Sequence, residues 1–333
     1  MISANKMEDT NGQEAVQTAA VNRNHVLSSP YLQKMQVRAA RLTIIVPTVG
    51  SIMAIVAAMV FEFSAFYVAL WLSMHLITML GITVGYHRLS AHRSFETTNN
   101  FVRSVLVIMG SMAAQGPVIH WVSNHRRHHE FSDEEEDTHS PHKYELGEQV
   151  GKLNPISRLC AGIWHAHIGW MFNSKVTNPS RYSRDLLKDP LVAMLNKRYP
   201  HWVVLGVVVP GLLGALFAGN IEGLILGVLW GGMLRIFTVH HSTWAINSIT
   251  HLFGRRPYAT SEKSTNNIWI VLPSAGEAWH NHHHAFPTSA RFGFEWWQVD
   301  LGYILIRFLA LFNLVKNVKE PTDKAKLSKM VSS

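Results

Sequence analysis

The sequence predicts an all-α integral membrane protein in which four transmembrane helices form two hairpins beneath a helical cap. Four apolar stretches are long enough to cross about 30 Å of hydrocarbon, and they come in two pairs, each joined by a short turn. Hydrophobic residues make up 47% of the chain and charged residues only 16%, against about 25% charged residues in an average soluble protein. We therefore expect lipid to surround much of the molecule.

The first apolar pair begins after a polar segment. Residues 31–41 carry three basic residues at helical spacing, which predicts a basic helix that lies on the membrane surface. Residues 42–61 contain no charged residue and form the first predicted span. A short turn containing Glu62 leads to the second span, residues 66–85, which ends next to His87.

The second pair has the same plan. Residues 202–220 form the third predicted span, a turn containing Glu222 follows, and residues 223–247 form the fourth span. Arg235 interrupts the apolar character of this last stretch. Because an arginine deep in lipid is unfavourable, we expect the last turns of the helix to rise out of the bilayer.

Basic residues set the predicted topology. They lie before the first span and after the second, whereas the two short turns each carry a glutamate. The positive-inside rule therefore places both termini and the middle segment in the cytoplasm, at the inner membrane if the source is bacterial. The cap then consists of residues 88–201 and 248–320. The net charge of +8 does not indicate a nucleic-acid partner, because the basic residues flank apolar blocks, where anionic lipid explains them better.

The cap and the two ends carry further signals. Residues 101–122 predict one helix half-buried at the membrane interface, and Asp189 followed by proline predicts the N-cap of another helix. Residues 301–314 predict an apolar helix that packs on the cap. We expect residues 1–30 to be disordered and free of a cleavable signal peptide. Residues 31–320 then form a single domain, and residues 321–333 a flexible tail.

Histidine clusters fall on the predicted cytoplasmic side. An H-x-x-H-H pattern occurs twice, an H-x-x-x-x-H pattern follows the second span, and a further histidine lies just beyond the fourth span, four residues after an asparagine. In a helix, the spacing i, i+3, i+4 places all three imidazoles on one side. These candidate ligands are His87, His92, His125, His128, His129, His251, His280, His283 and His284, with the amide of Asn247.

Nine imidazoles are more than one metal ion uses, so two ions fit the count better. Imidazole suits iron, zinc, copper and nickel, whereas calcium and magnesium prefer oxygen ligands. Zinc needs three or four ligands, and the single cysteine, Cys160, excludes a thiolate site. The residues favour a two-iron, oxygen-activating site. Four nearby carboxylates are expected to accept the second ring N–H of these imidazoles: Glu130, Glu277, Asp133 and Asp137.

The chain resembles membrane fatty-acyl desaturases of the stearoyl-CoA (delta-9) type, close to their bacterial members. The resemblance lies in residues 81–93, 125–133, 247–258 and 276–287, and with the four-span plan it covers about 40 to 315. It implies two ferrous ions held by the nine histidines in a cytosolic cap, with Asn247 acting through a water.

The same resemblance implies an activity. Family members insert a cis double bond into a saturated acyl chain, with oxygen as co-substrate and electrons from outside. The donor would be a separate protein of the ferredoxin or cytochrome b5 type with its reductase. The acyl chain could arrive as a thioester of coenzyme A or of a carrier protein, or as a glycerolipid.

The second span offers a hypothesis about chain length. His75 and Met79 lie twelve and eight residues before His87, which is roughly 18 and 12 Å along a helix. In the family this helix closes the far end of the acyl tunnel. We therefore expect these two side chains to line the tunnel and to limit how much chain fits beyond the new double bond.

Two other kinds of function remain open. The same metal site would serve a fatty-chain hydroxylase, acetylenase or decarboxylase, because a small shift of the substrate changes the outcome. A histidine-rich metal transporter is a remote alternative. Transporter ligands lie near the middle of the bilayer, whereas the predicted spans are nearly free of histidine apart from His75.

Overall fold

The structure is a computed structural model that describes residues 25–146, 151, 153–172 and 175–331. Most of the N-terminal segment that was expected to be disordered lies outside the described residues. Its last residues are structured: strand β1 (Val26–Leu27) pairs with β3 (Val176–Thr177), and the Ser29 side chain caps the helix that follows.

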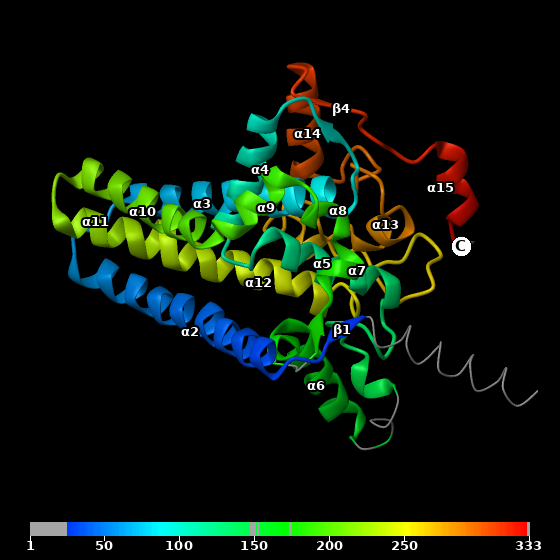
Figure 1. Cartoon of the computed structure of the whole chain (residues 1–333). Helices are drawn as coiled ribbons and strands as arrows, with labels where there is room; N and C mark the ends of the chain where they lie inside the picture. The colour runs from blue at the N-terminus through cyan, green and yellow to red at the C-terminus, as the bar shows by residue number, and fades with distance from the viewer. Residues whose placement is uncertain (1–24, 147–150, 152, 173–174, 332–333) are drawn as a thin grey trace, which may run out of the picture.

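Four helical segments in the described part of the chain are long and apolar enough to cross a membrane, which confirms the predicted class. The first is Pro30–Val60 (α2), and the third is Tyr199–Ala218 (α10). The second, Ala65–Ala91, consists of α3 (Ala65–Leu80) and η1 (Gly81–Ala91). The fourth, Ile221–Ser248, consists of α11 (Ile221–Gly227), η5 (Val228–Leu234) and α12 (Arg235–Ser248). They lie side by side, with both hairpin turns at one end and the cap at the other (Figure 1).

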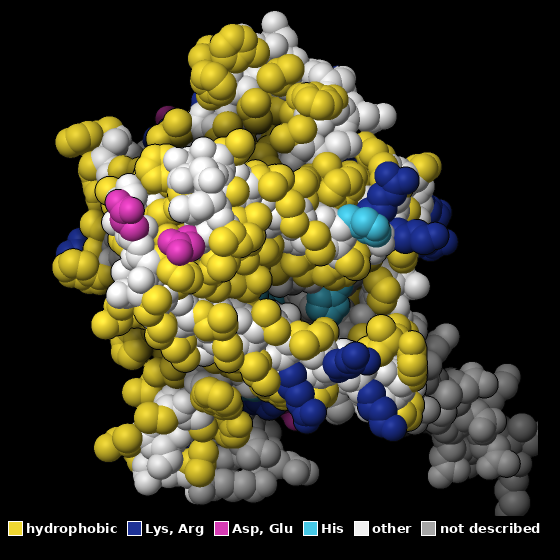
Figure 2. All heavy atoms as spheres, turned by 90° about the vertical axis from the view of Figure 1, so that its left-hand side faces the viewer, with side chains coloured by type: hydrophobic (Ala, Val, Ile, Leu, Met, Phe, Trp, Pro, Cys, Tyr) yellow, Lys and Arg dark blue, Asp and Glu magenta, His cyan; other side chains and the backbone are white. Residues whose placement is uncertain are grey.

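The surface of this bundle is apolar. Side chains such as Met59 and Leu216 are about four-fifths exposed, and hydrophobic atoms dominate the face seen from the turn end (Figure 2). Small residues such as Ala54 and Ala57 lie instead on the buried side of α2, where they allow close helix contact. The exposed apolar surface and the small-residue interior are typical of helices surrounded by lipid.

The first helix differs from the prediction in one respect. The basic segment 31–41 is not a separate surface helix, because α2 begins at Pro30 and continues without a break to Val60. The Ser29 cap and the proline at the first helical position start the helix before the basic residues. Its basic residues therefore lie on the first turns of the span.

Arg235 is accommodated inside the protein. Its guanidinium is fully buried and donates hydrogen bonds to the carbonyl oxygens of Met112, Gly206 and Gly231. These residues belong to α4 (Asn100–Met112), α10 and η5. We expected the last turns of this helix to rise out of the bilayer because an arginine in contact with lipid is unfavourable. That contact is avoided because carbonyl groups of three helices surround the guanidinium inside the protein.

The cap is built from short helices and two small two-stranded ladders. Besides β1 and β3 it contains α4 (Asn100–Met112), α5 (Val118–Phe131), η2 (Lys143–Glu145), α6 (Pro155–His167), η4 (Gly169–Phe172), α7 (Pro179–Tyr182), α8 (Arg184–Leu187), α9 (Pro190–Lys197), η6 (Ile268–Ile270), α13 (His280–Ala285), α14 (Leu301–Leu311), α15 (Asp323–Lys329), and the ladder of β2 (Glu96–Thr97) with β4 (Val315–Lys316).

The single helix predicted over residues 101–122 is wrong. The chain leaves helical geometry between α4 and α5, where Ala114 and Gly116 have positive φ angles of 59° and 97°. Gly116 also precedes Pro117, and the residue before a proline is disfavoured in the helical region. This break turns the chain and gives α5 its own direction.

Two other cap predictions are tested. The helix after Asp189 is confirmed, because the Asp189 carboxylate accepts hydrogen bonds from the N–H groups of Leu191 and Val192. The tail, which we expected to be flexible, forms α15 and continues into contacts with the cap. Its Lys329 carbonyl accepts a hydrogen bond from the Ala259 N–H at 2.8 Å.

One close approach positions η1. A Cβ atom on Gly85 would lie 2.4 Å from the carbonyl oxygen of Leu106 on α4, which is closer than real Cβ contacts allow. Glycine at this position therefore lets η1 lie directly against α4. The histidine that follows two residues later, His87, depends on this packing for its position.

We expect Arg235→Met to destabilise the bundle. The substitution leaves three buried carbonyl groups without their donor, and each such group costs about 1–3 kcal/mol. Thermal unfolding in detergent should show a clearly lower midpoint than in the parent protein. Arg307→Met on α14, where the arginine is exposed, is the matched control and should have little effect. Equal midpoints for the two variants would contradict this account of Arg235.

Candidate metal centre

The nine predicted histidines meet in two neighbouring clusters. The five-histidine cluster consists of His87, His92, His125, His129 and His283, and the four-histidine cluster consists of His128, His251, His280 and His284. Within each cluster, one ring nitrogen from every residue lies within 4.8 Å of the others. The clusters adjoin, since the rings of His128 and His129 are 5.7 Å apart between centroids.

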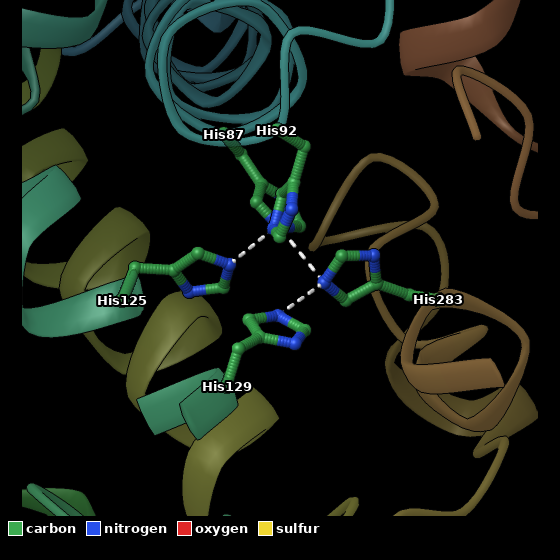
Figure 3. Close-up of side chains that lie close together, drawn as sticks. All are labelled: His87, His92, His125, His129 and His283. Atoms are coloured by element: carbon green, nitrogen blue, oxygen red, sulfur yellow. Dashed lines mark hydrogen bonds between the residues drawn. The ribbon is translucent and has the colours of Figure 1, made fainter. Parts of the chain in front are cut away.

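Figure 3 shows the five-histidine cluster, with its side chains converging from three elements. The Nε2 atoms of His87 and His129 lie 3.0 and 2.8 Å from Nε2 of His283. The Nε2 atoms of His92 and His125 are 2.7 Å apart. Several imidazole lone pairs therefore point at one small volume.

A π-helix explains the H-x-x-x-x-H spacing. In η1 the bonding runs from residue i to residue i+5, as in the hydrogen bond of 3.1 Å from the His92 N–H to the His87 carbonyl. Residues five apart therefore stack on one face, and the two imidazole centroids are 4.9 Å apart. In an ordinary α-helix residues five apart would diverge, so the π-helix is what lets both side chains serve one site.

Each H-x-x-H-H pattern is shared between the two clusters. On α5, His125 and His129 face the five-histidine cluster, while His128 belongs to the other. On α13 the division is reversed, because His283 joins the five-histidine cluster and His280 and His284 join the four-histidine cluster. The sequence placed the three imidazoles of each pattern on one side. In the structure the three imidazoles lie next to one another along that side but point to different clusters, so each helix contributes histidines to both clusters.

The four-histidine cluster has the same internal spacing, and one of its Nε2 atoms is unpaired. Nε2 of His280 lies 3.0 Å from Nε2 of both His251 and His284. Nε2 of His128 is buried and has no hydrogen-bond partner among the described residues. Leaving a buried polar atom unpaired is unfavourable, and a bound cation would satisfy it.

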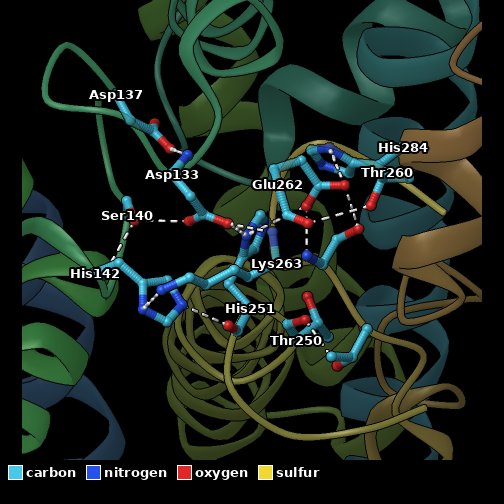
Figure 4. Close-up of polar contacts among 12 residues, drawn as sticks. Asp133, Asp137, Ser140, His142, Thr250, His251, Thr260, Glu262, Lys263 and His284 are labelled. Atoms are coloured by element: carbon cyan, nitrogen blue, oxygen red, sulfur yellow. Dashed lines mark hydrogen bonds and ion pairs between the residues drawn. The ribbon is translucent and has the colours of Figure 1, made fainter. Parts of the chain in front are cut away.

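Carboxylates hold the second ring nitrogens. The Nδ1 atom of His251 lies 2.9 Å from Asp133 (Figure 4). Nδ1 of His128 lies 2.9 Å from Asp137. Nδ1 of His87 is in close ion-pair contact with Glu277. Donation of the Nδ1 hydrogen to a carboxylate fixes the tautomer and leaves the Nε2 lone pair free. Of the four carboxylates singled out in the sequence, Asp133, Asp137 and Glu277 lie where they can do this, whereas Glu130 pairs with Arg181 at 2.5 Å.

Burial keeps most of these imidazoles neutral. Burial is the main cause that lowers the pKa of His92, His125 and His129 well below 6.5, and the neighbouring histidines add to it. The same holds for the three candidates on α13. Burial also acts to lower the pKa of His251, but the Asp133 carboxylate outweighs it, and the net pKa is raised. Neutral imidazole is the form that binds a metal.

The clusters fit imidazole-rich binding of two metal ions. Two ligands at right angles around a metal, with bonds of about 2.1 Å, stand about 3 Å apart, and the closest Nε2 pairs here are 2.7 to 3.0 Å apart. The donor set is all imidazole, which suits iron among other transition metals. The unpaired Nε2 of His128 and the neutral state of most rings point the same way.

Comparison with known proteins decides the family. The family model for fatty acid desaturases matches residues 20–310. The chain belongs to the fatty acid desaturase family. Its members named below are oxidoreductases that act on acyl chains, so the resemblance inferred from the histidine patterns is confirmed.

Three relatives illustrate the range within this family. A hex-5-enoyl-[acyl-carrier protein] acetylenase from Moorena producens is 41% identical over 307 residues, which cover 92% of this chain and 93% of the relative. An sn-1 stearoyl-lipid 9-desaturase from Anabaena variabilis is 38% identical, over 72% of this chain and 79% of its own. The protein of the same name from Synechocystis sp. is 37% identical, over 75% and 70%.

The remaining candidate residues of this desaturase-family chain lie on the second and fourth spans. Asn247 is half-buried on α12, four residues before His251, and its side chain has no hydrogen-bond partner among the described residues. His75 contacts Thr238 at 3.1 Å and the Pro273 carbonyl at 2.9 Å. Met79 is fully buried one turn further along.

The sequence analysis missed several residues that support the clusters. Glu262, in the loop before η6, is buried, and one of its oxygens lies 3.7 Å from Nδ1 of His284. His139, which is not among the nine histidines named from the sequence, is buried with its ring centroid 4.4 Å from that of His128. Arg88 is fully buried and contacts both Glu277 and Asp300. The Asp137-Thr138-His139 sequence offered a signal for His139, whereas nothing around Glu262 marked it.

We expect Asp133→Asn to weaken metal binding at the four-histidine cluster. The amide cannot replace the charged acceptor of the His251 N–H, and loss of such a partner typically lowers metal affinity about 10–100-fold. Titration of the metal-free protein with ferrous ion in the presence of a competing chelator measures the change. Asp323→Asn, in the exposed part of the tail, serves as the control. An affinity equal to that of the control would show that Asp133 does not support this cluster.

Proposed function

We propose that this chain is an oxygen-dependent, di-iron acyl desaturase that introduces a cis double bond into a saturated acyl chain. The observation that carries this proposal is the pair of adjacent imidazole clusters, with carboxylates on the second ring nitrogens of three of the histidines. Relatives named as stearoyl-lipid 9-desaturases support the reaction class.

The nine histidines take the role of iron ligands in this proposal. The five-histidine cluster would hold one ferrous ion, and the four-histidine cluster the other, with Asn247 adding a ligand through a water. When bound there, the two irons would supply the oxygen chemistry that removes two hydrogens from an unactivated chain. Asp133, Asp137 and Glu277 hold the imidazoles in the tautomer that presents Nε2.

The surroundings of the site follow from the same proposal. The clusters and both termini face the cytosol, because basic residues flank the spans on the cap side. Electrons come from a separate ferredoxin or cytochrome b5-type protein with its reductase. The substrate is an acyl thioester or acyl lipid drawn from or through the bilayer. A metal transporter is disfavoured, since the histidines gather at the cap end and the family is one of oxidoreductases.

A second candidate reaction has a specific observation behind it. The relative that matches almost the whole length of this chain is named as an acetylenase acting on a hex-5-enoyl group carried by acyl-carrier protein. An acetylenase removes two hydrogens from an existing double bond, with the same oxidant and a shifted or shorter substrate. The alternative is therefore that this chain makes a triple bond in a short acyl-carrier-protein thioester.

Product analysis distinguishes the two reactions. We expect the chain, expressed in a host without desaturases, to produce new monounsaturated chains that mass spectrometry can map to a single position. A parallel assay with purified protein, donor and hex-5-enoyl carrier protein tests the acetylenase. His283→Ala, which removes the imidazole whose Nε2 atom lies 3.0 Å from that of His87 and 2.8 Å from that of His129, should abolish either product. Alkyne without monoene would favour the acetylenase, and product from His283→Ala would contradict both.

The structure supports His75 and Met79 as the residues that limit chain length. His75 joins α3 to Thr238 on α12 and to Pro273 in the loop before α13, and Met79 lies buried against Thr243. These contacts would close the space between α3 and α12 below the clusters. Smaller side chains there should therefore open room for more of the acyl chain.

We expect His75→Ala, and Met79→Ala, to shift the product profile toward longer acyl chains. Gas chromatography of total lipids from the expressing host measures the profile. Leu76→Ala is the matched control, since Leu76 neighbours His75 on the same helix but is 41% exposed on the outer surface. Profiles that are identical for all three variants and the parent would refute a role of this helix in chain-length selection.

A further inference from the structure

A polar cavity of about 610 Å³ opens on the cap and reaches both clusters. Its floor includes His92 and His129 from the five-histidine cluster and His284 from the four-histidine cluster. Its rim includes the exposed residues Ser261 and Glu134. We call this cavity the funnel. The elements that carry its lining include α5, α13 and α15. These elements lie at the cap end of the molecule, away from the hairpin turns (Figure 1).

The exposure of the histidines agrees with the position of the funnel. Four of the nine candidate ligands are only half-buried, and the other five are buried. Three of those four are the histidines at the floor of the funnel: His92, His129 and His284. The accessible part of the metal centre is therefore reached from the cap surface.

The lining of the funnel suits ions and water better than an acyl chain. Most of its side chains are polar or charged, and burial against them would gain little of the stabilisation that apolar contact gives a hydrocarbon. The two cationic side chains in the wall are already engaged. Arg126 is paired with Asp185 at 2.7 Å, and the Lys329 ammonium donates to the Ala285 carbonyl at 2.6 Å.

The Glu262 carboxylate, by contrast, forms no ion pair with a lysine or arginine among the described residues. It lines the funnel but is itself buried, with one oxygen accepting the Ser264 hydroxyl at 2.8 Å. Among the described residues, its ion-pair neighbours are the imidazoles of His284, at 3.7 Å, and His251, at 4.0 Å. An arriving cation thus meets a buried carboxylate immediately next to the four-histidine cluster.

We propose that the funnel is the route by which ferrous iron enters and leaves the two clusters, with Glu262 as the carboxylate that receives the ion beside His284. This proposal rests on the proposed di-iron function. Carboxylate oxygen and imidazole together form a donor set that ferrous iron accepts. A route through the cap also keeps metal exchange separate from the membrane side of the molecule.

A removable chemical label at the rim of the funnel, which we call the plug, tests the route. The same folded protein can be measured with the label attached and after its removal. Ser261 is replaced by cysteine in a Cys160→Ser background, which removes the one native cysteine. A bulky methanethiosulfonate reagent then attaches through a disulfide, and a phosphine reductant removes it. The readout is the rate at which ferrozine extracts iron from the loaded protein, and the rate at which ferrous ion reloads it without oxygen.

The plug should slow extraction and reloading by about tenfold or more, because exchange must then wait for local opening of the cap. Reduction should restore both rates. Lys324→Cys in the same background is the control, since Lys324 is exposed on α15 and does not line the funnel; its label should leave the rates unchanged. Glu262→Gln should slow reloading, measured as the initial rate with ferrous ion in excess.

The possible failures are distinguishable. Iron that exchanges equally fast with and without the Ser261→Cys label overturns the route while leaving the di-iron assignment intact. Unplugged protein that takes up no iron overturns the di-iron assignment and the route with it. A reloading rate for Glu262→Gln equal to that of the parent overturns the role given to this carboxylate.

Discussion

The contact between a carboxylate and the second nitrogen of an imidazole is the interaction on which the site depends. Without it a ring is free to rotate or to exchange its tautomer, and its Nε2 lone pair no longer points at the cluster. Asp133 and Asp137 come from the loop that follows α5, and Glu277 lies just before α13. The segments that carry the histidines therefore also carry or adjoin the groups that orient them.

The membrane helices serve this arrangement by fixing two elements against each other. The second span changes from α-helix to π-helix before it reaches the cap, and this change aligns His87 with His92. The fourth span also contains a π-helical segment, immediately before Arg235. The guanidinium of that arginine joins three helices through their carbonyls. Internal polar contacts, as well as apolar packing, therefore hold the membrane helices together beneath the cap.

Much of the fold and of the candidate site was predictable, because both depend on patterns local in sequence. Apolar length gave the spans, and histidine spacing gave all nine members of the two clusters. The π-helix was not predictable, since it depends on packing such as that of Gly85 against α4. The division of each H-x-x-H-H pattern between two clusters, and the position of Glu262, depend on how distant segments meet. The break before Pro117 had a local signal in Gly116, which apolar length outweighed in our prediction.

The central claim is that the two clusters bind two irons. Elemental analysis of the parent protein, purified after expression with iron supplied, tests this most directly when several metals are measured in the same sample. The account predicts about two irons per chain, one for each cluster. Protein that is folded but contains no iron, or that contains zinc in its place, would contradict it.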